Sequence, residues 1–245
     1  MVNQYPEETS NHPFDLIAFD ADDTLWHNEH LYRDTQQKLK VLLSRYLNKD
    51  TIEDKLYETE LRNLEHFGFG IKSFALSMIE TAIELTDGKI QGYEIRQIID
   101  FARQMWNAKV ELLEHVQEVI TRLADIYPLM LLTKGDTLEQ ETKIARSGID
   151  QYFKAVEIMS QKSTSSYAAV LQKHHIDPNR FMMVGNSLKS DVLPVLELGG
   201  YGVYIPYEFT WAAEIENDKE ILSPRYFELE NIGRLPELIK QLATN

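Results

Sequence analysis

The chain alternates short apolar runs with stretches of helical periodicity. Five runs have the length and composition of buried strands, at residues 14–19, 128–133, 155–159, 181–184 and 201–206. Apolar residues at three- and four-residue spacing predict helices over residues 115–126, 138–146, 163–174 and 188–198. This alternation predicts an α/β fold with a doubly wound parallel sheet. We also expect an edge strand near Tyr226 and a closing helix over residues 232–243.

One region interrupts the alternation, because residues 29–109 contain no convincing strand. Four amphipathic runs occupy it instead, at residues 30–47, 51–67, 71–85 and 92–109. The pattern predicts a four-helix domain inserted after the first strand. We therefore assign residues 1–26 and 111–245 to an α/β core and residues 27–110 to the inserted helical domain.

The composition argues against several classes of function. The 245 residues are 43% hydrophobic and 26% charged, which predicts a folded core large enough for one domain with an insertion. The chain has no cysteine, so disulfides, thiolate metal sites and cysteine nucleophiles are excluded. A net charge of -14 without a basic cluster argues against binding nucleic acid or an anionic membrane surface. No apolar run could span a membrane, and the polar residues 1–13 lack a signal-peptide pattern, so we expect a cytoplasmic protein.

Three carboxylates follow the first predicted strand, at Asp20, Asp22 and Asp23. In an open parallel sheet, ligands bind beyond the carboxyl ends of the strands, which is where these residues lie. A hard divalent cation such as Mg²⁺ would relieve the repulsion between Asp20 and Asp22 by binding carboxylate and carbonyl oxygens. For this motif taken alone, an aspartate-rich turn that caps the following helix is the alternative.

The ends of the other predicted strands carry groups that suit the same site. The second strand ends in Thr133 and is followed by Lys134, and a hydroxyl and free backbone N–H groups at this turn suit a phosphate oxygen. Lys162 follows the third strand and would supply a compact positive charge. The fourth strand ends in GNSLKSD, which contains Asn186 and Asp191. Taken alone, each group is more often a helix cap or a solvated surface residue, but four successive strand ends favour one shared site.

Together these motifs resemble those of the haloacid dehalogenase (HAD) superfamily of hydrolases, which use an aspartate nucleophile. The resemblance spans nearly the whole chain in order, from DADDT at residues 20–24 through Thr133 and Lys162 to GNSLKSD at residues 185–191. The helical insertion matches the position of that superfamily's helical cap. The resemblance implies a Mg²⁺-dependent hydrolase of phosphate monoesters, a HAD-type phosphatase, in which the inserted helices form a cap domain.

The resemblance also implies a role for each matching residue. Asp20 would be the nucleophile that forms an aspartyl-phosphate, and Asp22 would protonate the leaving oxygen and then activate water. Mg²⁺ would bind the Asp20 carboxylate, the Asp22 backbone carbonyl and Asp191. Thr133 and Lys162 would hold the phosphoryl oxygens, and Lys162 would also temper the charge on Asp20.

Two residues depart from the superfamily's pattern. Asp23 replaces a usual glycine, and Asn186 replaces a usual aspartate after Gly185. The amide oxygen of Asn186 can bind the metal directly or through water but brings no charge. A catalytically weak or inactive phospho-ligand-binding member is therefore one alternative. A 2-haloacid dehalogenase is another, which the second carboxylate, Asp22, and the metal ligand Asp191 disfavour.

In the superfamily that the sequence resembles, a cap of this kind closes over the core and selects the substrate. His27, Phe69 and Lys72 are the candidate substrate-reading residues, although a helix–helix turn that needs glycine is the alternative for the stretch 66–74. The expected partner is a small phosphorylated metabolite, as for a phosphoglycolate phosphatase-like or nucleotidase-like enzyme. A phosphomutase would use the same groups. We expect a monomer, because a cap of this size can close the site without a partner subunit.

Overall fold

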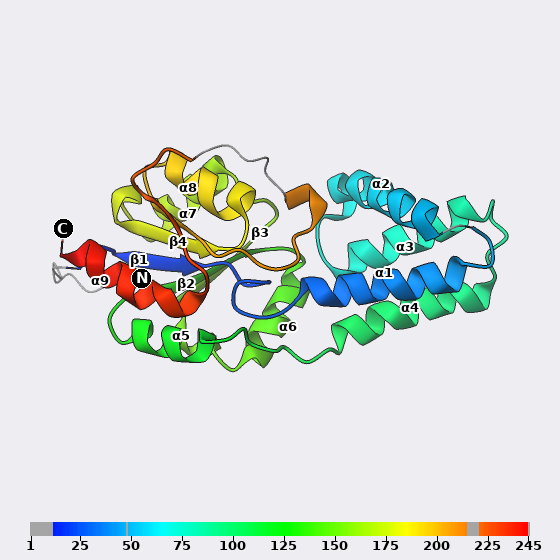
Figure 1. The fold of residues 1–245 in the computed structure, drawn as a ribbon, viewed down its shortest axis with the longest axis horizontal. Helices are drawn as coiled ribbons and strands as arrows, with labels where there is room; N and C mark the ends of the chain where they lie inside the picture. Colours follow the sequence, from blue (N-terminus) through cyan, green and yellow to red (C-terminus); the bar gives the residue numbers. More distant parts are fainter. Residues whose placement is uncertain (1–11, 48, 215–220, 245) are drawn as a thin grey trace. The chain divides into compact units, whose positions relative to one another are not determined.

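Six strands form one sheet among the residues that the structure describes. The computed structural model describes residues 12–47, 49–214 and 221–244, so most of the polar stretch at 1–13 lies outside them. The strand order is β3-β2-β1-β4-β5-β6 (Figure 1). The bounds are β1 Leu16–Phe19, β2 Leu129–Lys134, β3 Ala155–Met159, β4 Phe181–Gly185, β5 Tyr201–Tyr204 and β6 Tyr226–Glu228. The predicted α/β fold with a parallel sheet is confirmed, including the edge strand at Tyr226.

Strand β1 lies inside the sheet and pairs in parallel with β2 and β4. Phe19 is level with Leu131 on one side and with Val184 on the other. The strand order runs outward from β1 in both directions, which makes its carboxyl end a topological switch point. Asp20, the next residue, therefore leaves the sheet where ligands bind in folds of this class.

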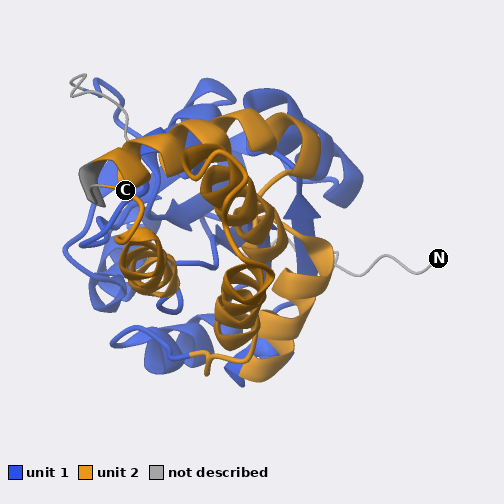
Figure 2. Ribbon diagram, turned by 90° about the vertical axis from the view of Figure 1, so that its right-hand side faces the viewer, with its two compact units in different colours: residues 1–27, 111–133, 147–245 blue, residues 28–110, 134–146 orange. Residues whose placement is uncertain are grey.

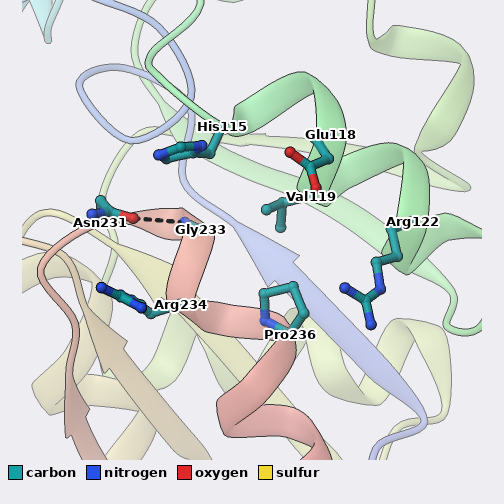
Figure 3. A pocket seen from close by; sticks show the side chains of 8 residues that line it. All are labelled: His115, Glu118, Val119, Arg122, Asn231, Gly233, Arg234 and Pro236. Carbon is teal, nitrogen blue, oxygen red and sulfur yellow. Dashed lines mark hydrogen bonds between the residues drawn. The ribbon is translucent and has the colours of Figure 1, made fainter.

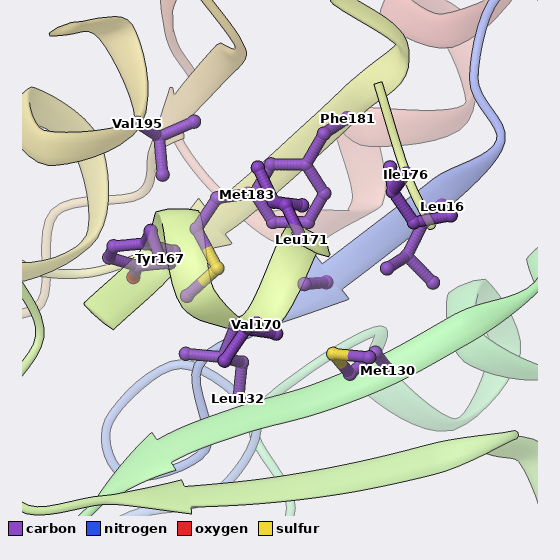
Figure 4. Packing of buried hydrophobic residues seen from close by; sticks show 11 residues of the cluster. Leu16, Met130, Leu132, Tyr167, Val170, Leu171, Ile176, Phe181, Met183 and Val195 are labelled. Atoms are coloured by element: carbon purple, nitrogen blue, oxygen red, sulfur yellow. The ribbon is translucent and has the colours of Figure 1, made fainter. Parts of the chain in front are cut away.

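Both faces of the central strands are buried. On one face, alternate residues of β1, β2 and β4 pack against α7 (Thr164–His174) and α8 (Leu193–Glu197), as Figure 4 shows. Residues of the opposite parity, such as Ile17 and Leu131, are also fully buried. On the other side of the sheet lie α5 (Val116–Ala124) and α9 (Leu235–Ala243), the predicted closing helix (Figure 1). Burial on both faces explains why these strands are continuous apolar runs.

The helix predicted over residues 188–198 is divided in the structure. A π-helical segment covers Leu188–Val192, and α8 follows it directly. Pro194, in the first turn of α8, has no N–H to donate to the carbonyl of Ser190, four residues earlier. That carbonyl accepts a 3.1 Å hydrogen bond from the hydroxyl of Tyr167 instead. The proline thus explains why a regular α-helix does not run through this stretch.

The chain forms two compact units, which Figure 2 distinguishes by colour. Unit 1 comprises residues 1–27, 111–133 and 147–245, and unit 2 comprises residues 28–110 and 134–146. The four amphipathic runs fold as α1 Glu29–Leu43, α2 Lys49–Phe67, α3 Ile71–Leu85 and α4 Gly92–Trp106. Their apolar faces meet in a core of their own that includes Leu39, Met78 and Ile98. The prediction of four helices without a strand therefore holds for the described part of residues 29–109.

Residues 134–146, which sequence periodicity assigns to the core, belong to unit 2. They include most of α6 (Thr137–Ser147). Glu139 accepts a 2.7 Å hydrogen bond from the backbone N–H of Ile71, the first residue of α3. Arg146 donates a 3.0 Å hydrogen bond to the backbone carbonyl of Trp106 at the end of α4. Periodicity carries no signal for such long-range contacts. The division of the chain into a core domain and an inserted domain stays a prediction.

Across the described segments, no helix combines the length and the apolar character needed to cross a membrane.

Candidate active site

Three charged side chains meet beyond the carboxyl ends of β1 and β4. The ammonium group of Lys162 lies 2.5 Å from Oδ1 of Asp20 and 2.7 Å from Oδ1 of Asp191. The exposed fractions of these side chains are 1% for Lys162, 10% for Asp20 and 1% for Asp191. One ammonium group and two carboxylates leave a surplus of negative charge in a buried position. A bound cation or a proton is needed to offset it, because unpaired buried charge is costly.

The pKa values of these groups follow from the burial and from the charges. Burial raises the pKa of Asp20 from its usual 3.8 to about 6, although Lys162 opposes the rise and Asp191 adds to it. Burial alone would lower the pKa of Lys162, but the attraction of Asp191 and Asp20 outweighs burial and raises that pKa. At neutral pH, Lys162 is therefore a fixed positive charge, and Asp20 is ionised in most molecules.

Asp191 is held against the backbone of Gly185. The N–H of Ser187 donates a 2.9 Å hydrogen bond to Oδ2 of Asp191. A Cβ atom at residue 185 would lie 2.3 Å from that oxygen, which is too close for any side chain. The glycine of GNSLKSD thus leaves the room that the aspartate of the same motif occupies.

Thr24 connects the first motif with the fourth. Its Oγ1 atom lies 3.1 Å from Oδ2 of Asp20 and 3.2 Å from Oδ1 of Asn186, and its side chain is buried. A hydroxyl donates to one acceptor at a time, so the carboxylate and the amide oxygen share one donor. The amide oxygen of Asn186 therefore faces the same hydroxyl as Asp20. The sequence pattern gives no sign of this bridge, beyond the position of Thr24 four residues after Asp20.

Asp22 is held by an indole group. Nε1 of Trp26 donates a 2.7 Å hydrogen bond to Oδ1 of Asp22, and Trp26 is 1% exposed. Between them, the N–H of Asp23 donates a 2.7 Å hydrogen bond to the carbonyl of Trp26, and Asp23 has a φ of 61°. Glycine adopts this left-handed conformation most readily, and aspartate is among the residues that tolerate it. The substitution of aspartate for glycine is therefore compatible with the turn.

Thr133 lies beside the same strand end as Asp20. It is 1% exposed at the end of β2. Phe19 is level with Leu131, so Asp20 follows that pair by one residue on its strand and Thr133 follows it by two residues on β2. Unit 1 thus brings Asp20, Thr133 and Lys162 to one edge of the sheet, together with Asn186 and Asp191.

Unit 2 brings a second set of predicted residues together. The ammonium group of Lys134 lies 4.6 Å from the centre of the Phe69 ring, and Lys72 forms a 2.7 Å ion pair with Asp136. Gly70, with a φ of 114°, has no room for a Cβ atom, which would lie 2.7 Å from Oε2 of Glu139. The stretch 66–74 therefore needs this glycine for its backbone.

His27 is engaged elsewhere, within unit 1. Its Nδ1 atom lies 2.7 Å from the hydroxyl of Tyr207, in the loop after β5, and the two rings are 5.8 Å apart. The sequence predicts a contact of His27 with substrate, and the structure gives this imidazole a protein partner.

Oxygen donors of several kinds gather around Asp20. Within the described residues, no group of three or more histidine, aspartate or glutamate side chains is arranged to hold a metal ion. The donors near Asp20 are instead mixed: the carboxylates of Asp20 and Asp191, which share Lys162, and the amide oxygen of Asn186, which shares the Thr24 hydroxyl with Asp20. All are hard oxygen ligands, and a buried surplus of negative charge accompanies them, so the residues fit Mg²⁺ in kind.

A cavity of about 390 Å³ lies elsewhere in unit 1, between α5 and the start of α9 (Figure 3). Charged side chains of both signs line it, from Glu118, Arg122 and Arg234. At its edge the side chain of Asn231 accepts a 3.0 Å hydrogen bond from the N–H of Gly233. None of the candidate site residues contributes to this cavity.

A comparison with protein families identifies the family to which the fold around Asp20 belongs. The model of the haloacid dehalogenase-like hydrolases matches residues 14–199. The chain belongs to this family. The matched stretch of this HAD-like hydrolase contains Asp20, Thr133, Lys162 and Asp191, so the resemblance drawn from the motifs is confirmed.

Solved structures of other proteins share the fold of this HAD-like hydrolase at different levels of sequence identity. A haloacid dehalogenase-like family hydrolase from Xanthomonas campestris is 37% identical with a TM-score of 0.86, and the match covers 98% of this chain and 95% of that chain. A 2-haloacid dehalogenase from Pseudomonas syringae pv. Tomato DC3000 is 19% identical with a TM-score of 0.62, over 93% and 99% of the two chains, which shows a shared fold alone.

Among curated proteins, the glyceraldehyde 3-phosphate phosphatase of Methanothermobacter thermautotrophicus is 26% identical over 142 residues. The match covers 54% of this chain and 62% of that phosphatase, which is less than two thirds of its length.

Proposed function

We propose that this HAD-like hydrolase is a Mg²⁺-dependent phosphatase that hydrolyses a small phosphorylated metabolite through an aspartyl-phosphate on Asp20. The buried cluster of Asp20, Lys162 and Asp191 carries the proposal. It supplies a carboxylate nucleophile, a fixed cation and a carboxylate suited to a metal at one edge of the sheet. Similarity to a glyceraldehyde 3-phosphate phosphatase adds support for phosphate ester chemistry.

In the first step, Asp20 attacks phosphorus and the bond from phosphorus to the leaving oxygen breaks. Lys162 binds one oxygen of the Asp20 carboxylate and Thr24 binds the other, so the nucleophile is oriented before substrate arrives. A pKa of about 6 leaves Asp20 anionic in most molecules at pH 7. Thr133 and Lys162 bind the phosphoryl oxygens.

Asp22 moves the protons in both steps. It donates a proton to the leaving oxygen and then accepts one from the water that attacks phosphorus, which frees Asp20 and releases inorganic phosphate. The hydrogen bond from Trp26 holds the Asp22 carboxylate for both transfers. Mg²⁺, held by Asp20, Asp191, the Asp22 carbonyl and Asn186, would offset negative charge on the phosphoryl group.

Asn186 favours a second candidate, a phospho-ligand-binding protein with little turnover. Its neutral amide lies 3.2 Å from the Thr24 hydroxyl, at a position where the related pattern has a charged carboxylate. A bound Mg²⁺ would then be held by fewer charges and more weakly. Haloacid dehalogenase activity is a third candidate, suggested by the shared fold with such an enzyme and disfavoured by the presence of Asp22.

The proposed substrates are small phosphate monoesters, and a panel of them would identify the preferred compound. Phosphoglycolate, triose phosphates, sugar phosphates and nucleoside monophosphates are the compounds to compare, and His27, Phe69 and Lys72 are the proposed readers of the leaving group. We propose that the enzyme acts as a monomer.

Phosphate release from this panel and from an aryl phosphate tests the proposal. The wild-type protein should release phosphate with Mg²⁺ and lose that activity in EDTA, and the Asp20→Asn protein should be inactive under both conditions. Release at the wild-type rate from Asp20→Asn would overturn the mechanism. Halide release from a 2-haloacid without added metal would favour the dehalogenase.

A further inference from the structure

Glu214 binds the turn of residues 185–191. It ends a short 3-10 helix, Ala212–Glu214, in the loop after β5. Its Oε2 atom accepts hydrogen bonds from the hydroxyls of Ser187 at 2.7 Å and Ser190 at 2.6 Å. Both serines are buried, with exposed fractions of 7% and 6%. One carboxylate oxygen thus holds two side chains of the turn together, which restrains the turn from outside it.

Ser187 carries the restraint onward to Asp191. Its backbone N–H donates a 2.9 Å hydrogen bond to Oδ2 of Asp191, and its Oγ atom accepts a 3.0 Å hydrogen bond from the N–H of Ser190. The other carboxylate oxygen of Asp191 binds Lys162 at 2.7 Å. A continuous series of direct contacts therefore connects Glu214 with the cluster around Asp20.

The same loop is attached to the turn at a second point. The ammonium group of Lys189 donates a 2.8 Å hydrogen bond to the backbone carbonyl of Ala213. The turn is π-helical over Leu188–Val192, and this geometry lacks the regular hydrogen bonds of an α-helix. Side-chain contacts from outside the turn therefore have a larger share in fixing its conformation.

We infer that Glu214 is a positioning residue for the metal site, acting through Ser187 and Ser190 on the orientation of Asp191. The inference rests on the proposed function, since it assumes that Asp191 binds Mg²⁺. The neutral Asn186 makes the orientation of Asp191 more important, because fewer charged ligands share the binding. Removal of hydrogen-bond partners of metal ligands typically lowers metal affinity by about 10- to 100-fold.

Three variants distinguish the effect of the Glu214 hydrogen bonds from the effect of its negative charge. Glu214→Ala removes both hydrogen bonds. Glu214→Gln removes the charge but keeps an amide oxygen that accepts from the two serines. Glu208→Ala is the matched control, because Glu208 is an exposed glutamate of the same loop and its loss changes the net charge equally.

Two measurements on the substrate-free proteins test the inference. Calorimetric titration with Mg²⁺ should show about tenfold weaker binding for Glu214→Ala, and binding within about threefold of wild type for Glu214→Gln and Glu208→Ala. Hydrogen exchange in EDTA should be faster at the amides of residues 187–191 in Glu214→Ala alone. Thermal melting confirms that each variant is folded.

Wild-type Mg²⁺ affinity and wild-type exchange in the Glu214→Ala protein would overturn the inference. An equal loss in Glu214→Gln would also overturn it, because the charge rather than the hydrogen bonds would then matter. A wrong proposed function would give a different result from a wrong inference about Glu214. In that case the wild-type protein itself would bind no Mg²⁺ and release no phosphate. The exchange measurement needs no metal, so it still reports whether Glu214 positions the turn.

Discussion

Lys162 binds Asp20 across 2.5 Å, and both side chains are almost completely withdrawn from water. Because Lys162 also binds Asp191, one ammonium group orients the proposed nucleophile and the proposed metal ligand together. Removal of the shared cation from a buried cluster of this kind is destabilising, because it leaves buried charges without compensation. The cluster can therefore be tested without any substrate.

Replacement of Lys162 by methionine should destabilise the protein. The change would leave Asp20 and Asp191 as two buried carboxylates without their shared cation. We expect a loss of about 3–5 kcal/mol in the free energy of unfolding, measured by urea denaturation at pH 7 in EDTA.

Lys173→Met is the control for this variant. Lys173 is 64% exposed and pairs with Glu157 at 2.8 Å on the surface, so its loss should cost about 1 kcal/mol or less. Similar losses for the two variants would contradict a special role for the buried cluster.

Asp20→Asn should make the metal-free protein more stable at neutral pH. The pKa of Asp20 is raised to about 6 in the folded protein, chiefly by burial, so the stability linked to its protonated form is fully present below pH 3.8 and is lost as the pH rises through 6. Asparagine does not ionise and avoids this loss. The advantage of the variant should therefore grow between pH 4 and pH 7, to about 2–3 kcal/mol.

Denaturant unfolding in EDTA across this pH range measures that difference. Saturating Mg²⁺ should reduce it, since a bound cation stabilises the charged carboxylate of the wild-type protein. A difference that is constant from pH 4 to pH 7 would contradict the shifted pKa.

Gly185→Ala should displace Asp191. The new Cβ atom would lie 2.3 Å from Oδ2 of Asp191, so the carboxylate or the backbone must move. We expect a loss of about 1–3 kcal/mol in stability and a severe loss of Mg²⁺-dependent phosphate release. Gly92→Ala is the matched control, because its Cβ atom would meet nothing within 4 Å, and it should retain wild-type activity and stability.

Trp26→Phe should slow turnover without much change in KM. The variant keeps an aromatic ring in the core but removes the Nε1 donor that lies 2.7 Å from Asp22. If Asp22 transfers protons, a misplaced carboxylate should lower kcat by roughly 10- to 100-fold. In Asp22→Asn, the same tryptophan replacement should have little further effect. Full additivity of the two changes would show that Trp26 acts independently of Asp22.

The architecture could be predicted because it depends on local patterns. Continuous apolar runs such as residues 181–184 mark strands buried on both faces, and the runs at residues 71–85 and 92–109 have the period of helices packed on one side. The division of residues 188–198 was not predicted. Pro194, which causes the division, was visible in the sequence. Its effect on the helix also depends on the hydroxyl of Tyr167, which donates a hydrogen bond to the Ser190 carbonyl.

The site could be predicted only as far as strand ends determine it. Asp20, Lys162 and Asp191 come together because parallel strands place their carboxyl ends at one edge. Thr24 and Glu214 were missed, because their contacts are set by side-chain direction and by a loop that returns 24–27 residues later in the chain. The spacing of hydrophobic residues contains no information about the contacts of Thr24 or of Glu214.

The most direct test of the central claim is to look for a phosphoryl group on Asp20. The enzyme is mixed with its best substrate and Mg²⁺, quenched in acid within the first turnover, digested and examined by mass spectrometry. We predict a phosphorylated peptide that contains Asp20, absent from the Asp20→Asn protein and from samples without substrate. Phosphate release in the steady state without any such peptide, or at an undiminished rate in Asp20→Asn, would contradict the account.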